Sequence, residues 1–202
     1  MTVYILRHGR TAYNDQRRYQ GQLDIPLSPE GEAELIAAPF SPALVYVSPL
    51  RRAQQTARRI FPAARQQIVP DFAEMDFGDF DGRTAYEMAE DAAYRAWVEG
   101  DCTAQCPNGE SRALFCERTC AAFARLLDES ATRGEKRVVI VAHGGTLRAV
   151  MERFALPERD YFDWTTGNAC GYALRRDAAL WRERRRMEIA ERLCFVKGGA
   201  PC

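Results

Sequence analysis

The stretch Val3-Tyr4-Ile5-Leu6-Arg7-His8-Gly9 decides the fold, because a short apolar run passes directly into a basic residue, a histidine and a glycine. Such a run, bounded by turn residues, predicts a buried β-strand. The run Val138–Ala142 is followed by His143-Gly144 in the same way. Because the carboxyl ends of parallel strands meet at one edge of a sheet, we expect the two histidines to share one crevice.

Short apolar runs alternate with segments of helical periodicity along the rest of the chain. Leu44–Val47 is a third β-branched run, and helices are predicted clearly over 50–60 and 146–154 and loosely from Thr11 onward. This alternation is typical of α/β proteins. We therefore expect one domain over residues 1–202, a three-layer α/β/α sandwich with a mainly parallel (mixed) sheet and a small helical cap-like insertion.

Capping signals and periodicity predict three more helices. Ser28 has the character of an N-cap, with Pro29 at the first helical position, and this helix should end at Pro39. Two longer helices are predicted over 84–99 and 110–130.

The remaining segments are predicted to be loop and strand. Residues 100–109 form a loop, and the cap-like insertion extends over about 83–108. Near the end, 170–174 and 180–184 flank a turn around Asp177 and predict a hairpin or two edge strands.

Composition limits the partners that the chain can have. A formal net charge of +0, from 28 basic and 28 acidic residues, gives no overall attraction to nucleic acid or to an anionic membrane. No apolar run approaches the roughly 20 residues of a membrane span, and the N-terminus lacks the features of a signal peptide. We therefore expect a cytoplasmic protein that binds neither nucleic acid nor membrane.

The seven cysteines are an odd number in a chain without an evident export signal, which disfavours a disulfide framework. Cys102, Cys106, Cys116 and Cys120 form two Cys-x-x-x-Cys pairs that could hold zinc. Their spacing is unusual for zinc, and the second pair has the spacing of small apolar residues on a helix. The expectation is therefore no metal and no cofactor.

The segment Ser48–Ala57 places arginine in the first turns of a helix, where a positive charge opposes the helix macrodipole. Arg52 would lower stability there unless an anion is bound. Together with Arg7, the two histidines and the helix-start amides, it predicts a site for a dianion such as phosphate. In the alternative reading, Arg51 and Arg52 are both exposed.

Five ordered motifs resemble those of one family. Leu6–Asn14, with the sequence Leu-Arg-His-Gly-Arg-Thr-Ala-Tyr-Asn, resembles the signature of the histidine phosphatase (phosphoglycerate mutase-like) superfamily. Four further segments match in the expected order: Gln20-Gly21 with Asp24–Ser28 and Gly31, Ser48–Ala57, Glu74–Gly78, and His143-Gly144. The resemblance runs from Val3 to about Leu174.

The resemblance implies a role for each matching residue. His8 would be the nucleophile that forms a phosphohistidine, and Glu74 the general acid that protonates the leaving oxygen. The residues implied to bind the phosphoryl group are Arg7, Asn14, Arg52, His143 and Gly144. Gln20 and Gly21 would line the substrate side. Phosphoryl transfer needs mainly positioning and charge compensation, so two arginines can take the role of a metal ion.

Several functions stay open. The short chain and modest insertion favour a phosphatase over a cofactor-dependent phosphoglycerate mutase, which must shield its phosphohistidine from water. Among phosphatases, the chain resembles most those acting on α-ribazole 5′-phosphate in cobalamin assembly, with a broad-specificity phosphatase as the next interpretation. Outside the family, a zinc hydrolase and a non-catalytic phosphate-binding module are the alternatives. The expected partner is a small phosphorylated metabolite, and the sequence leaves the oligomeric state unknown.

Two positions depart from the family pattern. Arg10 stands where relatives commonly have glutamate or glutamine, so it either adds positive charge near the site or points to solvent. Asn108 stands where many relatives have a second glycine.

Overall fold

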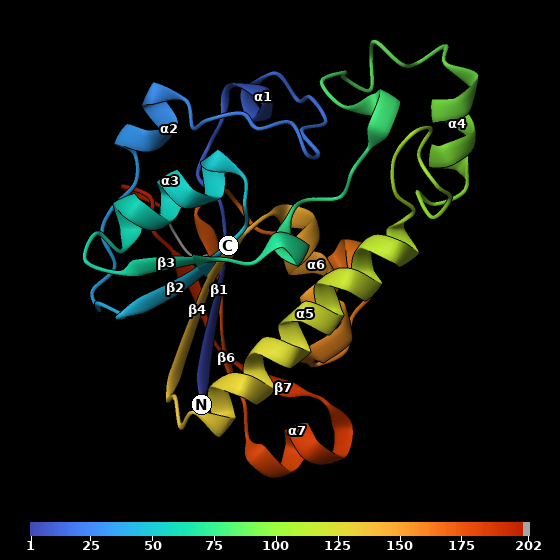
Figure 1. Ribbon diagram of the computed structural model, residues 1–202. Helices are drawn as coiled ribbons and strands as arrows, with labels where there is room; N and C mark the ends of the chain where they lie inside the picture. Colours follow the sequence, from blue (N-terminus) through green and yellow to red (C-terminus); the bar gives the residue numbers. More distant parts are fainter. Residues whose placement is uncertain (200–202) are drawn as a thin grey trace.

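The computed structural model describes residues 1–199, whose strands form one mixed sheet (Figure 1). β1 (Thr2–Arg7) pairs in parallel with β4 (Arg137–Ala142). β2 (Leu44–Val47) lies beside β4, and β3 (Arg65–Ile68) forms the edge, both also in parallel. The three strands predicted from the apolar runs are confirmed, and they are neighbours in the sheet.

The other half of the sheet is mainly antiparallel. β6 (Cys170–Arg175) pairs antiparallel with β1, and β7 (Met187–Cys194) pairs antiparallel with β6. The short β5 (Ala155–Leu156) pairs in parallel with β7. Across residues 1–199 the strand order is β3-β2-β4-β1-β6-β7-β5.

Helices cover both faces of this sheet. α3 (Arg51–Ile60) packs on one face, and α5 (Arg112–Thr132) and α6 (Gly144–Phe154) pack on the other (Figure 1). Successive residues of β4 point to opposite faces, so Ile140 joins the core under α5 and α6 and Val141 the core under α3. The three-layer α/β/α arrangement is confirmed. None of the helices in the described residues is long and apolar enough to cross a membrane.

The shorter helices differ in extent from the predictions. α1 (Ala12–Asp15) is a single turn. α2 (Pro29–Ala33) begins after its predicted N-cap Ser28 but ends well before Pro39. α4 (Ala92–Glu99) covers only the second half of the predicted helix, because the Asp91 carboxylate caps a new N-terminus there.

The predicted strand over 180–184 is wrong. The carboxylate of Asp177 accepts hydrogen bonds from two following backbone amides and begins a helix, α7 (Ala178–Arg184), on which Trp181 is buried. The strand that pairs with β6 is β7, further along the chain. The turn around Asp177 favoured a hairpin, but the Asp177 side chain caps the N-terminus of a helix instead.

The cysteines differ from the prediction made for them. Cys170 and Cys194 face each other in the β6–β7 pairing and are joined by a disulfide, contrary to the expectation of none. The cysteines of the candidate zinc pairs are free thiols: Cys102, Cys106, Cys116 and Cys120. No three His, Cys, Asp or Glu side chains of residues 1–199 gather in a way that could hold a metal ion.

The segment between β3 and α5 builds a small core of its own. Phe80, Met88, Tyr94 and Trp97 are buried together and pack with Tyr161. Figure 1 shows this segment, which contains α4, standing beyond the carboxyl end of β1. Its inner surface forms one wall of a pocket.

Candidate active site

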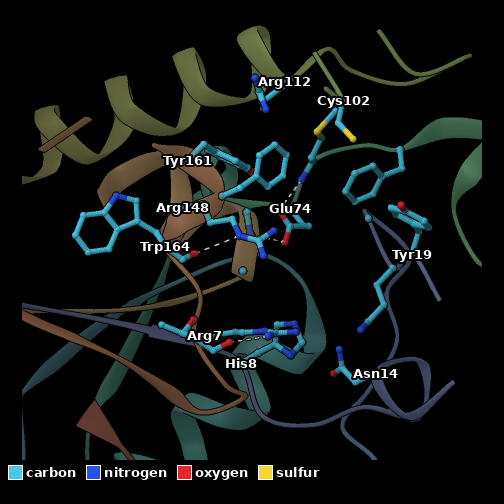
Figure 2. Close-up of a pocket in the computed structure, with 18 of the residues that line it drawn as sticks. Arg7, His8, Asn14, Tyr19, Glu74, Cys102, Arg112, Arg148, Tyr161 and Trp164 are labelled. Carbon is cyan, nitrogen blue, oxygen red and sulfur yellow. Dashed lines mark hydrogen bonds between the residues drawn. The ribbon is translucent and has the colours of Figure 1, made fainter. Parts of the chain in front are cut away.

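A pocket of about 310 Å³ lies at the carboxyl ends of the central strands (Figure 2). In Figure 2, Arg7 and His8 lie at one end of the pocket and Arg112 at the other, with Glu74 between them. The first group marks what we call the inner end, next to the sheet, and Arg112 marks the outer end. Most of the predicted site residues line this pocket: Arg7, His8, Asn14, Gln20, Gly21, Arg52, Glu74 and Gly144.

His8 follows β1 and is only 3% exposed. Its Nδ1 lies 2.7 Å from the carbonyl oxygen of Gly9, which can only accept, so Nδ1 carries the proton. Nε2 is then left with its lone pair. Burial, followed by the charges of Arg52 and Arg7, holds the pKa of His8 well below its ordinary value of 6.5. The ring is therefore a neutral imidazole at neutral pH, as a nucleophile requires.

His143 follows β4 and lies behind His8 rather than on the pocket wall. The two ring centroids are 5.2 Å apart, so the histidines are neighbours at the strand ends as predicted, but of the two His8 alone lines the pocket. His143 Nε2 lies 2.6 Å from the Ser48 hydroxyl, and burial holds the pKa of His143 well below 6.5. Its other nitrogen, Nδ1, is buried and has no partner within residues 1–199.

Arg52, in the first turn of α3, is fully buried, so the alternative in which it is exposed is wrong; Arg51 is exposed. The two terminal nitrogens of Arg52 donate to the carbonyls of Leu23 and Gly21, each at 2.7 Å. Burial lowers the pKa of Arg52 to about 10, against the opposing effect of Glu74. The guanidinium therefore remains charged at neutral pH.

Arg7 is held in a similar way, by a hydrogen bond of 2.8 Å from Nη1 to the carbonyl of Thr166. The Nε atoms of Arg7 and Arg52 are buried and lack partners among the described residues. A buried charge bound only to neutral carbonyls is costly unless an anion joins it. The inner end thus has the electrostatics of an anion site.

Asn14 is fixed in α1 by the capping box that it makes with Thr11. Its Oδ1 also accepts a hydrogen bond from Asn168 Nδ2 at 3.2 Å. The same Asn168 nitrogen lies 3.2 Å from the His8 carbonyl and 3.3 Å from the Gly9 carbonyl. With Oδ1 engaged, the side-chain nitrogen of Asn14 is the atom left to donate into the pocket.

Glu74 is fixed by two backbone amides. Its Oε1 accepts from the amide of Met75 and its Oε2 from the amide of Gly145, both at 3.0 Å. A Cβ atom on Gly145 would overlap Glu74 Oε1, so a side chain there would displace the Glu74 carboxylate. Gly144, by contrast, has room for a side chain, and it contributes the first amide of α6 to the pocket wall.

Gln20 and Gly21 form the side wall of the inner end. Gln20 Oε1 accepts a hydrogen bond of 2.9 Å from the Thr11 hydroxyl. Gly21 has a φ of +42°, and a Cβ atom there would overlap the Asp81 carboxylate. Because the Gly21 carbonyl also holds Arg52, this glycine supports the guanidinium as well as lining the pocket.

Residues 3–188 match the family model described as histidine phosphatase superfamily (branch 1). The chain belongs to the histidine phosphatase superfamily. Named phosphatases among its relatives show that it is an enzyme of this kind.

Two phosphatases resemble the chain in sequence, and one crystal structure of a phosphatase resembles it in fold. The adenosylcobalamin/alpha-ribazole phosphatase of Escherichia coli is 31% identical over 185 residues, which are 86% of this chain and 89% of that protein. The glucosyl-3-phosphoglycerate phosphatase of Mycolicibacterium vanbaalenii is 35% identical over 161 residues, 73% of this chain and 71% of that protein. The crystal structure of the alpha-ribazole phosphatase from Shigella flexneri has a TM-score of 0.78 at 27% identity, covering 88% and 92% of the two chains.

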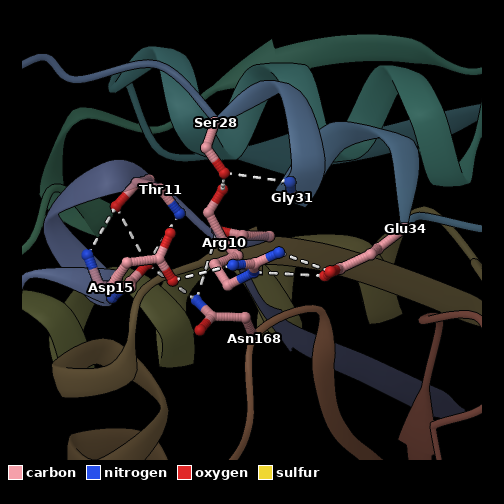
Figure 3. A network of polar contacts seen from close by, with 9 residues as sticks. Arg10, Thr11, Asp15, Ser28, Gly31, Glu34 and Asn168 are labelled. Carbon is pink, nitrogen blue, oxygen red and sulfur yellow. Dashed lines mark hydrogen bonds and ion pairs between the residues drawn. The ribbon is translucent and has the colours of Figure 1, made fainter.

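Arg10 adds no free charge to the site of this histidine phosphatase. It does not line the pocket and pairs with Glu34 at 2.5 Å and with Asp15 at 2.9 Å (Figure 3). Its backbone packs so closely on Gly31 that a Cβ atom on that glycine would overlap the Arg10 carbonyl. The positive charge of Arg10 is therefore balanced by the carboxylates of Glu34 and Asp15.

Asn108, the second departure, has a backbone conformation that glycine can also adopt. Its φ is +57°, in the left-handed region that glycine adopts freely and asparagine tolerates. Its side-chain nitrogen lies 3.0 Å from both carboxylate oxygens of Asp79. The contact between Asn108 and Asp79 thus stabilises the turn at residue 108.

Sequence reasoning missed three supporting residues. Ser48 binds His143, and Thr56 accepts from the Gly9 amide at 2.8 Å while donating to the Arg52 carbonyl at 2.6 Å. Both lie in a motif segment, and a buried hydroxyl on the apolar face of α3 could have revealed Thr56. Asn168 precedes β6 in a turn, where a single asparagine carries little signal.

Proposed function

We propose that this histidine phosphatase is a metal-independent phosphomonoesterase that acts through a phosphohistidine on His8. The observation that carries the proposal is the group of three buried, unpartnered nitrogens beside a neutral His8: Arg7 Nε, Arg52 Nε and His143 Nδ1. The two guanidinium nitrogens are donors suited to phosphoryl oxygens, and His143 Nδ1 is a third donor when Nε2 accepts the Ser48 hydroxyl proton; the two guanidinium charges match a phosphate dianion. Clustered arginines would repel a divalent cation.

The proposed reaction has two steps. In the first, Nε2 of His8 attacks phosphorus, the ester bond breaks, and protonated Glu74 gives its proton to the leaving oxygen. In the second, Glu74 takes a proton from water, the water oxygen attacks phosphorus, and the P–N bond breaks to release phosphate. Arg7 and Arg52 offset the charge on the phosphoryl oxygens in both steps. Asn14 and the Gly144 amide add further donors.

α-Ribazole 5′-phosphate is a candidate substrate. Support comes from the relatives that are named for it and from the aromatic rings of the pocket, since a planar base can stack on such rings. The aromatic residues that line the pocket are Tyr19, Phe77, Trp97, Tyr161, Phe162 and Trp164. A broad-specificity phosphatase would accept many esters at similar rates.

The test is hydrolysis in heavy-oxygen water with EDTA present, using p-nitrophenyl phosphate, α-ribazole 5′-phosphate and 3-phosphoglycerate. The proposal predicts inorganic phosphate that carries one heavy oxygen atom, undiminished by chelation. Isomerised phosphoglycerate as the main product would indicate a mutase. Activity lost with EDTA and restored by zinc would indicate a metal hydrolase, and binding without turnover a phosphate-binding module.

A further inference from the structure

The outer end of the pocket carries two arginines that the proposed chemistry does not use. Arg112 begins α5 and Arg148 lies in α6, and both line the pocket (Figure 2). The Arg112 guanidinium carbon lies 5.3 Å and 5.2 Å from the ring centroids of Tyr161 and Phe162. The Arg148 carbon lies 5.9 Å and 5.7 Å from the same two rings. The two cations therefore share one aromatic support.

Both arginines are anchored by neutral groups. Arg112 Nη1 donates to the Asp101 carbonyl at 3.1 Å, and Arg148 Nε donates to the Trp164 carbonyl at 3.2 Å. Arg18, which lines the same pocket, is instead paired with both carboxylate oxygens of Glu87, at 2.8 Å and 2.9 Å. Arg112 and Arg148 thus keep terminal N–H groups for a ligand, whereas Arg18 is neutralised.

Charge counting shows what the pocket still needs. Asp24, Asp81 and a bound phosphate dianion offset the positive charges of the inner end. Arg112 and Arg148 at the outer end give two further positive charges, and Glu74, which lines the pocket between the two ends, gives one negative charge, so one positive charge is left over there. Protonation of Glu74 only increases this surplus. One carboxylate would balance it, and a carboxylate accepts paired N–H groups from a planar guanidinium.

We infer that Arg112 and Arg148 form a carboxylate subsite, so that preferred substrates are small phosphomonoesters bearing a carboxylate. The inference rests on the proposed function, since it places the substrate phosphate at His8. The aromatic support keeps the two guanidinium groups oriented and partly dehydrated, which strengthens binding of a single anion. Phosphorylated hydroxy acids and amino acids therefore rank above α-ribazole 5′-phosphate, whose base is neutral.

The test compares substrates that differ only in the carboxylate: phosphoserine with phosphoethanolamine, and 3-phosphoglycerate with glycerol 3-phosphate. We expect kcat/KM to favour the acid of each pair by about ten- to a hundredfold. Arg112→Met and Arg148→Met should each lower this preference about tenfold, and Arg112→Lys should keep part of it. Arg137→Met is the matched control, because Arg137 also stacks on a ring, that of Phe40 at 4.7 Å, outside the pocket.

The outcomes are separable. Equal kcat/KM for the members of both pairs, or variants that slow both members by the same factor, would overturn the carboxylate subsite. Turnover of p-nitrophenyl phosphate in those same samples would show that the proposed phosphatase mechanism still holds. A wild-type enzyme that releases phosphate from none of the esters would instead refute the proposed function itself. Circular dichroism of each variant checks that it is folded.

Discussion

The inner and outer ends of the pocket are built in different ways. At the inner end, His8 is 3% exposed and follows strand β1 of the central sheet, and Arg52 is fully buried in α3, which packs on that sheet. At the outer end, Phe162 is 49% exposed and belongs to the short 3-10 helix Tyr161–Asp163. We therefore propose that the inner end fixes the chemistry and that the outer end selects the substrate. Changes at the inner end should slow every substrate alike, and changes at the outer end should alter the order of preference.

The largest effect is expected for His8→Gln. Glutamine keeps the polarity and approximate size of histidine but cannot form a phosphohistidine, so turnover should fall at least about 10³-fold. The fall should be the same for phosphoserine and phosphoethanolamine, because the nucleophile acts on the phosphate alone. Phosphate release measures both. A variant that lost activity on only one of these two substrates would contradict the proposal that the inner end fixes the chemistry and the outer end selects the substrate.

Glu74→Gln should give the next effect, and one that depends on the leaving group. Alkyl phosphates leave as poor alkoxides and need a proton, so their hydrolysis should slow by about 10² to 10⁴-fold. p-Nitrophenolate departs easily, so p-nitrophenyl phosphate should lose distinctly less in the first step. Single-turnover kinetics are required, because Glu74 also serves in the second step. Equal slowing of the two esters would mean that Glu74 only shapes the pocket.

Asn168→Ala tests the frame behind the inner end. The change removes the donor shared by the His8 and Gly9 carbonyls and Asn14, so the free energy of unfolding should fall by about 1–2 kcal/mol. We expect kcat to fall about tenfold, with the preference for phosphoserine over phosphoethanolamine unchanged. Urea unfolding and steady-state kinetics check both. A changed preference would show that the two ends are coupled.

The last prediction concerns stability rather than turnover, and it involves Asp81, which lies against Gly21 of the inner end. Burial, and then the nearby charge of Asp76, raises the pKa of Asp81 to about 7. The folded protein thus binds this proton more tightly than the unfolded chain does, so the stabilisation is complete below about pH 4 and is lost as the pH rises to about 7. Asp81→Asn should remove this loss. Urea midpoints of both proteins from pH 4 to 8 should diverge, and parallel curves would contradict the assignment.

The same contrast explains what could be predicted from sequence. His8 and His143 were predictable because each ends an apolar strand, and strand ends of a parallel sheet meet wherever the loops run. The outer arginines were not, because Arg112 and Arg148 meet only through the packing of α5, α6 and the turn that carries Phe162.

Local sequence patterns also gave wrong predictions where the structure depends on contacts between distant segments. The turn around Asp177 favoured a strand over 180–184, yet these residues belong to α7. The register of β6 and β7, which joins Cys170 to Cys194, cannot be inferred from the spacing of the cysteines.

The most direct test of the account is to find where the phosphoryl group is held between the two steps. Substrate carrying radiolabelled phosphate is mixed rapidly with excess enzyme, quenched in alkali to preserve phosphohistidine, and the protein is digested and mapped. The chain has only two histidines, His8 and His143, so the assignment is unambiguous. The account predicts label on the peptide that contains His8 and none on the peptide that contains His143. Label on His143, or free phosphate formed in a single turnover without any labelled histidine, would contradict it.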